Sequence, residues 1–169
     1  MSVSRPRESR LELRPLARGD EEELLRIHST PEVVRWWDHP EEDFPWDEPD
    51  STRFTILVDG RIAGLIQYWE EREPRYRHAG VDLFLDPKLH GRGFGTKAVA
   101  RIVDLLVSER GHHRITIDPA LANAAAIRCY EKAGFKAIGV MRQAERNSIG
   151  EGWHDCLLME LVIPAGSAS

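Results

Sequence analysis

The chain has 169 residues, of which 41% are hydrophobic and 30% are charged, and its formal net charge is −5. This length and composition are typical of one globular domain, so we expect residues 1–169 to form a single domain. The negative charge and the lack of a long basic block argue against nucleic acid or anionic membrane as partners. Since no apolar run is long enough for a membrane span or a signal core, we expect a cytoplasmic protein.

The two cysteines, Cys129 and Cys156, match no metal-binding spacing. In a reducing compartment two isolated cysteines are more often packed thiols than a disulfide. The sequence therefore predicts free thiols and no metal, and it does not distinguish a monomer from a homodimer.

The first part of the chain predicts a strand, two helical segments and a hairpin. In chain order these are a strand at 10–16, a helix at 19–28, a short helix at 31–37 and strands at 53–58 and 61–69. Pro31 is suited to the first position of a helix, and Asp59-Gly60 is a strong hairpin signal.

The second part predicts strands alternating with helices, followed by two last strands. The expected elements are a strand at 78–86, a helix at 95–109, a strand at 113–118, a helix at 123–133, strands at 135–142 and 153–163, and a frayed tail from 164. Val99, Ile102, Val103 and Leu106 have helical spacing, and Asn123 and Gly134 are suited to begin and end a helix.

A glycine-rich turn, with Gly91, Gly93 and Gly95, joins the strand at 78–86 to the helix at 95–109. Glycine permits backbone dihedrals that other residues avoid and a close approach to a ligand. The first N–H groups of the helix have no internal partner and lie at its positive end, where an anion such as a pyrophosphate binds. The alternative is a tight connection without a ligand.

Two aspartates, Asp82 and Asp118, lie on or at the end of neighbouring predicted strands. Asp82 points away from the face shared by Val81, Leu83 and Leu85, where an isolated carboxylate is costly unless it is paired or used. Asp118 precedes a proline, and by itself this favours a turn role. If both carboxylates face one groove, they can bind an ammonium group and accept its proton.

The segment 38–50 contains seven acidic residues and no Lys or Arg, with Phe44 and Trp46 among them. Such a segment is most simply solvated surface. It also predicts attraction of a polycation, with aromatic surfaces for sugar rings.

Two motifs resemble the cofactor-contacting blocks of the GNAT N-acyltransferase superfamily. The run from His90 to Gly95 matches the family's Q/R-x-x-G-x-G/A loop, except that His90 stands where Gln or Arg is usual. The second block, N-x-x-A-x-x-x-Y-x-x-x-G-F, matches Asn123, Ala126, Tyr130, Gly134 and Phe135.

The resemblance implies an α/β (α+β) fold with a mixed, mainly antiparallel sheet, flanked by helices, and a V-shaped splay between the fourth and fifth strands. It implies acetyl-CoA as cofactor, transfer of an acetyl group to an amine, and Tyr130 as proton donor to the departing thiolate. A core position for Tyr130 and a helix cap at Asn123 are the simpler alternatives. The implied cofactor-binding residues are Phe84, Leu85, His90, Gly91, Arg92, Gly93, Phe94, Gly95, Thr96, Asn123, Ala126 and Tyr130.

Several patches look like one branch of the aminoglycoside 6'-N-acetyltransferases, among them Val34–Trp37, Gly64–Gln67, Gly80–Asp82 and Ala126–Phe135. The branch implies catalytic roles for Asp82 and Tyr130, and an acceptor site of Trp36, Trp37, Gln67, Asp82 and Asp118. The segment 69–78 shares little with it. The alternatives are acetylation of a peptide amine or a siderophore precursor, and a non-catalytic acyl-CoA sensor.

Overall fold

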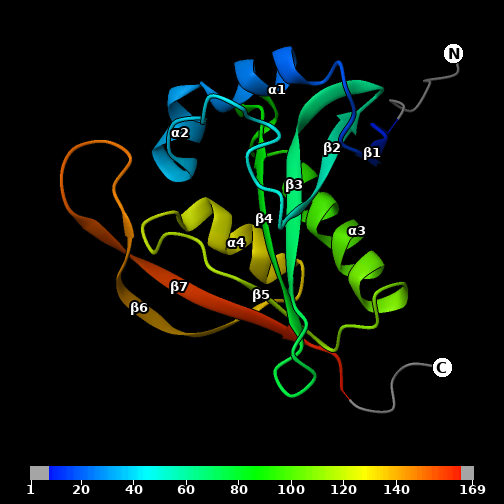
Figure 1. The fold of residues 1–169 in the computed structure, drawn as a ribbon, viewed down its shortest axis with the longest axis vertical. Coiled ribbons are helices and arrows are strands. Elements are labelled where there is room, and N and C mark those ends of the chain that lie inside the picture. The colour runs from blue at the N-terminus through cyan, green and yellow to red at the C-terminus, as the bar shows by residue number, and fades with distance from the viewer. Residues whose placement is uncertain (1–7, 165–169) are drawn as a thin grey trace, which may run out of the picture.

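The computed structural model describes residues 8–164, so the tail expected from 164 lies, beyond Pro164, outside the described residues. These residues form a seven-stranded sheet in the order β1-β2-β3-β4-β5-β7-β6 (Figure 1). The order of strands and helices along the chain is the predicted one, with an added 3-10 turn, η1. The strands are β1 (Leu11–Pro15), β2 (Thr52–Val58), β3 (Arg61–Glu71), β4 (His78–Leu85), β5 (Arg114–Ile117), β6 (Lys136–Arg146) and β7 (Trp153–Val162), and the helical elements are α1 (Glu21–His28), α2 (Pro31–Trp37), η1 (Pro87–Leu89), α3 (Phe94–Ser108) and α4 (Ala124–Lys132).

Strands β1 to β4 form an antiparallel meander. The predicted hairpin turn between β2 and β3 is confirmed, since Asp59 and Gly60 both have positive φ. Such a turn follows the natural twist of the two strands.

The sheet opens between β4 and β5. These two strands are parallel and pair only at Ala79 with Ile115 and at Gly80 with Thr116. Beyond Gly80 the two strands separate, which confirms the expected splay. Strand β7 lies between β5 and β6, an order that the sequence did not predict.

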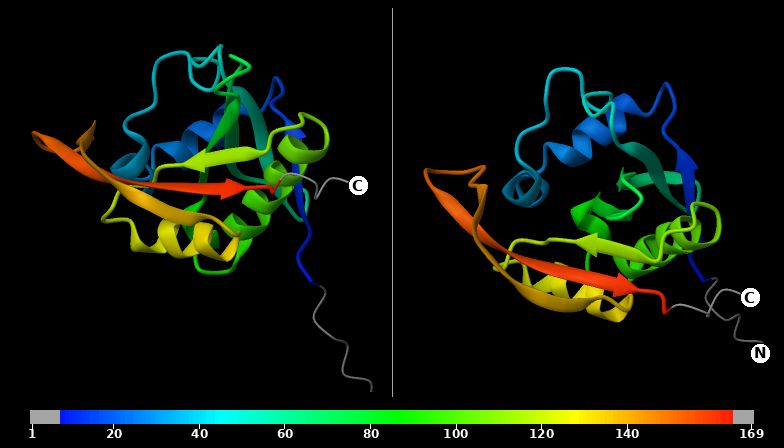
Figure 2. Two further views of the ribbon diagram at one scale, coloured as in Figure 1. Left: turned by 90° about the horizontal axis from the view of Figure 1, so that it is seen from below. Right: turned by 60° about the horizontal axis from the view of Figure 1, so that its bottom comes forward.

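Helices cover both faces of the sheet (Figure 2). A large core joins α3 and α4 to one face and includes Val99, Ile102, Ile115 and Met159. A smaller core under α1 and α2 includes Leu24, Ile27 and Phe84. Among the described residues no helix has the length and apolar character needed to cross a membrane.

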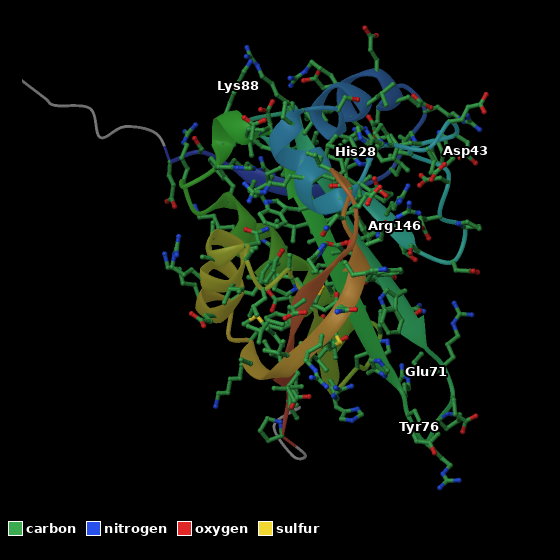
Figure 3. All side chains as sticks on the ribbon, turned by 90° about the vertical axis from the view of Figure 1, so that its left-hand side faces the viewer. His28, Asp43, Glu71, Tyr76, Lys88 and Arg146 are labelled. Carbon is green, nitrogen blue, oxygen red and sulfur yellow. The ribbon has the colours of Figure 1, made fainter. Side chains whose placement is uncertain are left out.

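Strands β6 and β7 extend from the body of the molecule as a long hairpin (Figure 1). Strand β6 runs to Arg146, beyond the predicted end at 142, because bulges between Met141 and Glu145 let pairing with β7 resume. The connection after β6 reaches α2, where the Ser148 hydroxyl donates to the carbonyl of Arg35 at 3.0 Å. Figure 3 faces this side of the molecule, with Arg146 at the end of β6.

Candidate functional site

The glycine-rich turn follows η1 and leads directly into α3. Gly91 and Gly93 have φ of +73° and +82°, and a Cβ on either would meet no atom within 4 Å. The backbone is therefore open on its outer side where glycine is needed. The first bond within the helix runs from the Lys97 N–H to the Gly93 carbonyl, which leaves the N–H groups of residues 94–96 for an anion.

Gly95 has a packing role that the sequence did not predict. It lies in the first turn of α3, which begins at Phe94 rather than at 95, and it does not have positive φ. A Cβ there would lie 3.0 Å from the Cys129 sulfur. Gly95 therefore permits the close approach of α4 to α3, an approach also bridged by the hydroxyl of Thr96, which donates to the carbonyl of Cys129 at 3.3 Å.

His90 and Arg92, the remaining loop candidates, are solvent-exposed. A ring nitrogen of His90 lies 3.0 Å from the carbonyl of Leu85 and so closes the end of β4. The Arg92 guanidinium lies 5.1 Å from the ring centre of the buried Phe94. Arg92 thus offers a cation next to the free N–H groups.

The open edge of β4 belongs to Leu83 and Leu85. Leu83 donates its N–H to Asp82 and accepts from the Trp37 indole, so its backbone groups do not face β3. Because alternate residues direct their backbone groups to opposite edges, Leu85 shares this edge and Phe84 faces β3. A Cβ on Gly64 of β3 would collide with the Phe84 carbonyl. Phe84 also packs its ring in the core under α1, so its backbone groups do not lie on the open edge where pairing with the pantetheine arm was expected.

On the other side of the splay, α4 carries the second motif. The Asn123 side chain accepts from the Ala126 N–H at 3.2 Å, so the helix-cap interpretation is confirmed. Ala126 is half-buried and packs against the large core. Tyr130 is 7% exposed and lies against Phe135 in the large core. Burial, then the charges of Asp82, Cys129 and Asp118, raises its pKa well above the ordinary value, and the phenol is a neutral proton donor.

The structure brings Asp82, Asp118 and Tyr130 close enough for their charges to interact. Asp82 is exposed to solvent, yet the protein packed around its carboxylate displaces part of the surrounding water. This desolvation, followed by repulsion from Asp118, raises the pKa of Asp82 to about 8. The pKa of Asp118 is also raised, first by desolvation and then by Glu145.

Glu145 is a site residue that the sequence analysis missed. It lies at the bulge of β6 and adds a third carboxyl group beside Asp82 and Asp118. The sequence places it more than 20 residues from either aspartate, and only the pairing of β7 between β5 and β6 brings it to the same face. Alternation along β6 could not identify this position, because the strand is bulged there.

The tryptophan and glutamine candidates lie on the α2 side of the sheet. Trp37 contacts Phe84 edge-on and donates to the Leu83 carbonyl at 3.0 Å. Trp36 is half-buried, with the Arg35 guanidinium 4.5 Å from its ring centre. Gln67 is paired in register with Asp82 and accepts from Arg53 at 2.8 Å. Gln67 and Asp82 therefore share one face of the sheet.

Two pockets meet at Trp69. The first has a volume of about 380 Å³ and is lined by Pro49, Asp50, Ser51, Thr52, Tyr68, Trp69, Glu70 and Arg72. The second, of about 240 Å³, is lined by Trp69, His78, Gly80, Val81, Arg114, Thr116, Asp118 and Leu158. The first includes Asp50 at the end of the acidic segment, and the second includes Asp118. Trp69 and His78, at the two ends of the segment 69–78, line these pockets.

Two residues of the acidic segment are less exposed than expected. Phe44 is buried against His28 and Phe84, so it offers no surface to a sugar ring. Asp47 is bonded to Arg53. The carboxylates of Glu41, Glu42 and Asp43 remain exposed on the loop that Figure 3 labels at Asp43.

The family model described as the acetyltransferase (GNAT) family matches residues 21–135. The chain is 32% identical over 133 residues to an aminoglycoside N(6')-acetyltransferase type 1 from Klebsiella pneumoniae, a match that covers 64% of this chain and 65% of that protein. It is 42% identical over 92 residues to a kanamycin resistance protein from Rhizobium radiobacter, covering 53% of this chain and 78% of that protein. It is 27% identical over 139 residues to a spermidine N(1)-acetyltransferase from Escherichia coli strain K12, covering 76% of this chain and 74% of that protein.

Solved structures agree with these relatives. The aminoglycoside acetyltransferase AAC(6')-Ib in complex with coenzyme A and kanamycin superposes with a TM-score of 0.74 at 26% identity, covering 90% of this chain and 95% of that one. A spermidine N-acetyltransferase from Vibrio cholerae in complex with CoA and spermine superposes with a TM-score of 0.76 at 23% identity over the same shares, a likeness of fold alone. The chain belongs to the acetyltransferase (GNAT) family.

Proposed function

We propose that the protein transfers an acetyl group from acetyl-CoA to a primary amine of a polycationic acceptor, and that its preferred acceptor is an aminoglycoside acetylated on the 6'-amine. The observation that carries the proposal is the meeting of Asp82 and Asp118 with Tyr130 at the splay of the sheet. Negative charge to hold an ammonium and a neutral phenol to donate a proton are both needed for this reaction.

The residues around the splay fit acetyl-CoA. The glycine-rich turn offers free N–H groups for the pyrophosphate, and the open edge of β4 presents the Leu85 N–H to the pantetheine arm. Acetyl-CoA supplies the activated thioester.

Asp82 would accept the proton of the amine, directly or through a water molecule. A base is most effective when its pKa lies near the working pH, and the pKa of about 8 at Asp82 meets this condition. Asp118 would hold the ammonium before attack. Tyr130 would donate its proton to the sulfur of the departing thiolate.

The pockets at Trp69 support a long cationic acceptor. Their linings include Asp50 and Asp118, beside Arg72 and Arg114, and they share Trp69, whose ring, with 44% of the residue's surface exposed, offers an aromatic face. Similarity to the type 1 aminoglycoside relative and to the kanamycin resistance protein supports the aminoglycoside.

Spermidine is the second candidate acceptor, favoured by similarity to the spermidine N(1)-acetyltransferase. Thiol release from acetyl-CoA distinguishes the candidates when kanamycin, an aminoglycoside with a 6'-hydroxyl, spermidine and a lysine-containing peptide are compared at equal concentration. We expect kcat/KM for kanamycin to exceed the others at least tenfold. Equal rates for the 6'-amine and 6'-hydroxyl drugs, or faster acetylation of spermidine or the peptide, would overturn the aminoglycoside assignment.

A further inference from the structure

The β6–β7 hairpin holds a cluster of metal-ligating side chains beside the two aspartates. The cluster consists of Glu145 on β6 and His154 and Cys156 on β7. Glu145 and His154 are directly paired in the register of the two strands. Cys156 follows two residues after His154, so the period of the strand places all three on one face.

The spacing of the three ligand atoms suits one metal ion. Glu145 Oε2 lies 3.5 Å from His154 Nε2 and 3.6 Å from Cys156 Sγ, and all three atoms lie within 4.8 Å of one another. Tetrahedral zinc with bonds of about 2.0 to 2.3 Å separates its ligands by roughly 3.3 to 3.8 Å. Two of the three separations therefore already have the length that a shared zinc ion requires.

The orientation of His154 is a second, independent observation. Its Nδ1 lies 3.0 Å from the side-chain oxygen of Asn147, which fixes the ring. Its Nε2 is buried and has no hydrogen-bond partner among residues 8–164, although it faces Glu145. A ligating histidine characteristically donates its other N–H to such an oxygen, which directs the free lone pair at the metal.

We propose that Glu145, His154 and Cys156 form a zinc site with an open fourth position. Thiolate, imidazole and carboxylate are the ligands that zinc takes in proteins, and three protein ligands leave one position for water or another molecule. On binding, the Cys156 thiol forms a sulfur–zinc bond and releases its proton to solvent. Asn147 acts as the positioning residue of the site through His154.

Because the site lies near Asp118, bound zinc should affect binding of the acceptor. This expectation rests on the proposed function. Glu145 and Cys156 lie close enough to Asp118 for their charges to interact. A doubly charged ion there would reduce the negative potential of the groove and occupy the carboxylate of Glu145. Zinc would therefore raise KM for a polycationic acceptor and leave the affinity for acetyl-CoA unchanged.

Cobalt titration of the full, chelator-treated protein tests the site without any acceptor. We expect one equivalent of Co²⁺ to produce the visible bands of tetrahedral cobalt and a sulfur-to-cobalt charge-transfer band, and Zn²⁺ to abolish both. Cys156→Ser should remove the charge-transfer band. Cys129→Ser, which changes the chain's other cysteine, should retain it.

Variants of the other ligands keep the test independent of the buried thiol. His154→Gln and Glu145→Gln should weaken cobalt binding at least tenfold, Asn147→Ala about ten- to a hundredfold, and the control Glu131→Gln not at all. No cobalt spectrum, or one that survives Cys156→Ser or is lost in Cys129→Ser, would overturn the site. A cobalt site without any effect of zinc on acceptor KM would leave the metal site standing and contradict only its link to the proposed function.

Discussion

At Asp82, packing has removed much of the water that an ionised carboxylate needs, and Asp118 adds repulsion. Between about pH 4 and pH 8 the folded protein therefore keeps a proton on Asp82 that the unfolded chain has already released. Because the folded state binds more protons in this range, the contribution of Asp82 to stability falls as pH rises toward 8. The pKa that would suit the proposed base is therefore obtained at the expense of stability.

Asp82→Asn should therefore stabilise the protein while it removes the proposed base. Since the side chain reaches solvent, we expect a modest gain of about 1 kcal/mol, or 2–4 °C in Tm at pH 8, which disappears near pH 4. In the same variant kcat/KM should fall, and its rise with pH toward 8 should flatten. Thermal unfolding and rate profiles across pH measure both effects, with Asp104→Asn, an exposed aspartate on α3, as the control. A variant that keeps the full pH response would assign the base to another group.

Tyr130→Phe should separate acid catalysis from packing. The phenylalanine retains the contact with Phe135 but has no hydroxyl, so kcat should fall about ten- to a thousandfold with acetyl-CoA affinity nearly intact. Tyr76→Phe, at an exposed position between β3 and β4, is the matched control. Unchanged turnover in the Tyr130 variant would leave that residue a core tyrosine alone.

At the level of the elements, two glycines have different roles where η1 leads through the glycine-rich turn into α3. Gly93 has positive φ and open space beside it, whereas Gly95 is helical and lies against Cys129. A side chain at Gly93 strains the backbone that presents the N–H groups. A side chain at Gly95 pushes α4 away from α3.

Valine at each position should consequently produce a different defect. Gly93→Val should raise the acetyl-CoA dissociation constant tenfold or more, measured by calorimetry. Gly95→Val should also weaken binding and lower Tm, and adding Cys129→Ala should recover part of the Tm loss because it removes the sulfur. Cys129→Ala should not restore the Tm or the acetyl-CoA affinity of the Gly93→Val variant. Recovery in both backgrounds, or in neither, would contradict the division of roles.

Over the whole molecule, the net charge of −5 and the exposed acids of segment 38–50 favour the approach of a polycation. Attraction between exposed charges weakens as salt shortens the Debye length to about 5 to 6 Å near 0.3 M. The effect belongs to the field of the molecule, because Glu41, Glu42 and Asp43 line neither pocket at Trp69.

The salt dependence of steady-state rates should show the effect of this electrostatic attraction. We expect kcat/KM for kanamycin to fall several-fold between low salt and 0.3 M salt, and neutralisation of Glu41, Glu42 and Asp43 together to reduce that dependence. The control neutralises Asp104, Glu109 and Glu131, which are exposed on α3, just after it and on α4. An equal reduction in both triple variants would show that net charge alone matters.

The sequence by itself determined the order of strands and helices, the hairpin at Asp59-Gly60, the cap at Asn123 and the outward direction of Asp82, because these follow from periodicity and local backbone chemistry. It also determined the family, through the glycine-rich turn and the block from Asn123 to Phe135. Such signals lie within a few residues of one another, so they can be read without knowledge of distant contacts.

Only the tertiary structure decided which distant residues meet. The insertion of β7 between β5 and β6 brings Glu145 to the two aspartates, and the pairing of β6 with β7 brings it to His154 and Cys156. The burial of Phe44 and the contact of Gly95 with Cys129 likewise depend on packing between elements. Spacing along the chain carries no record of these contacts, because strand order and bulges, rather than local preference, set the distances across a sheet.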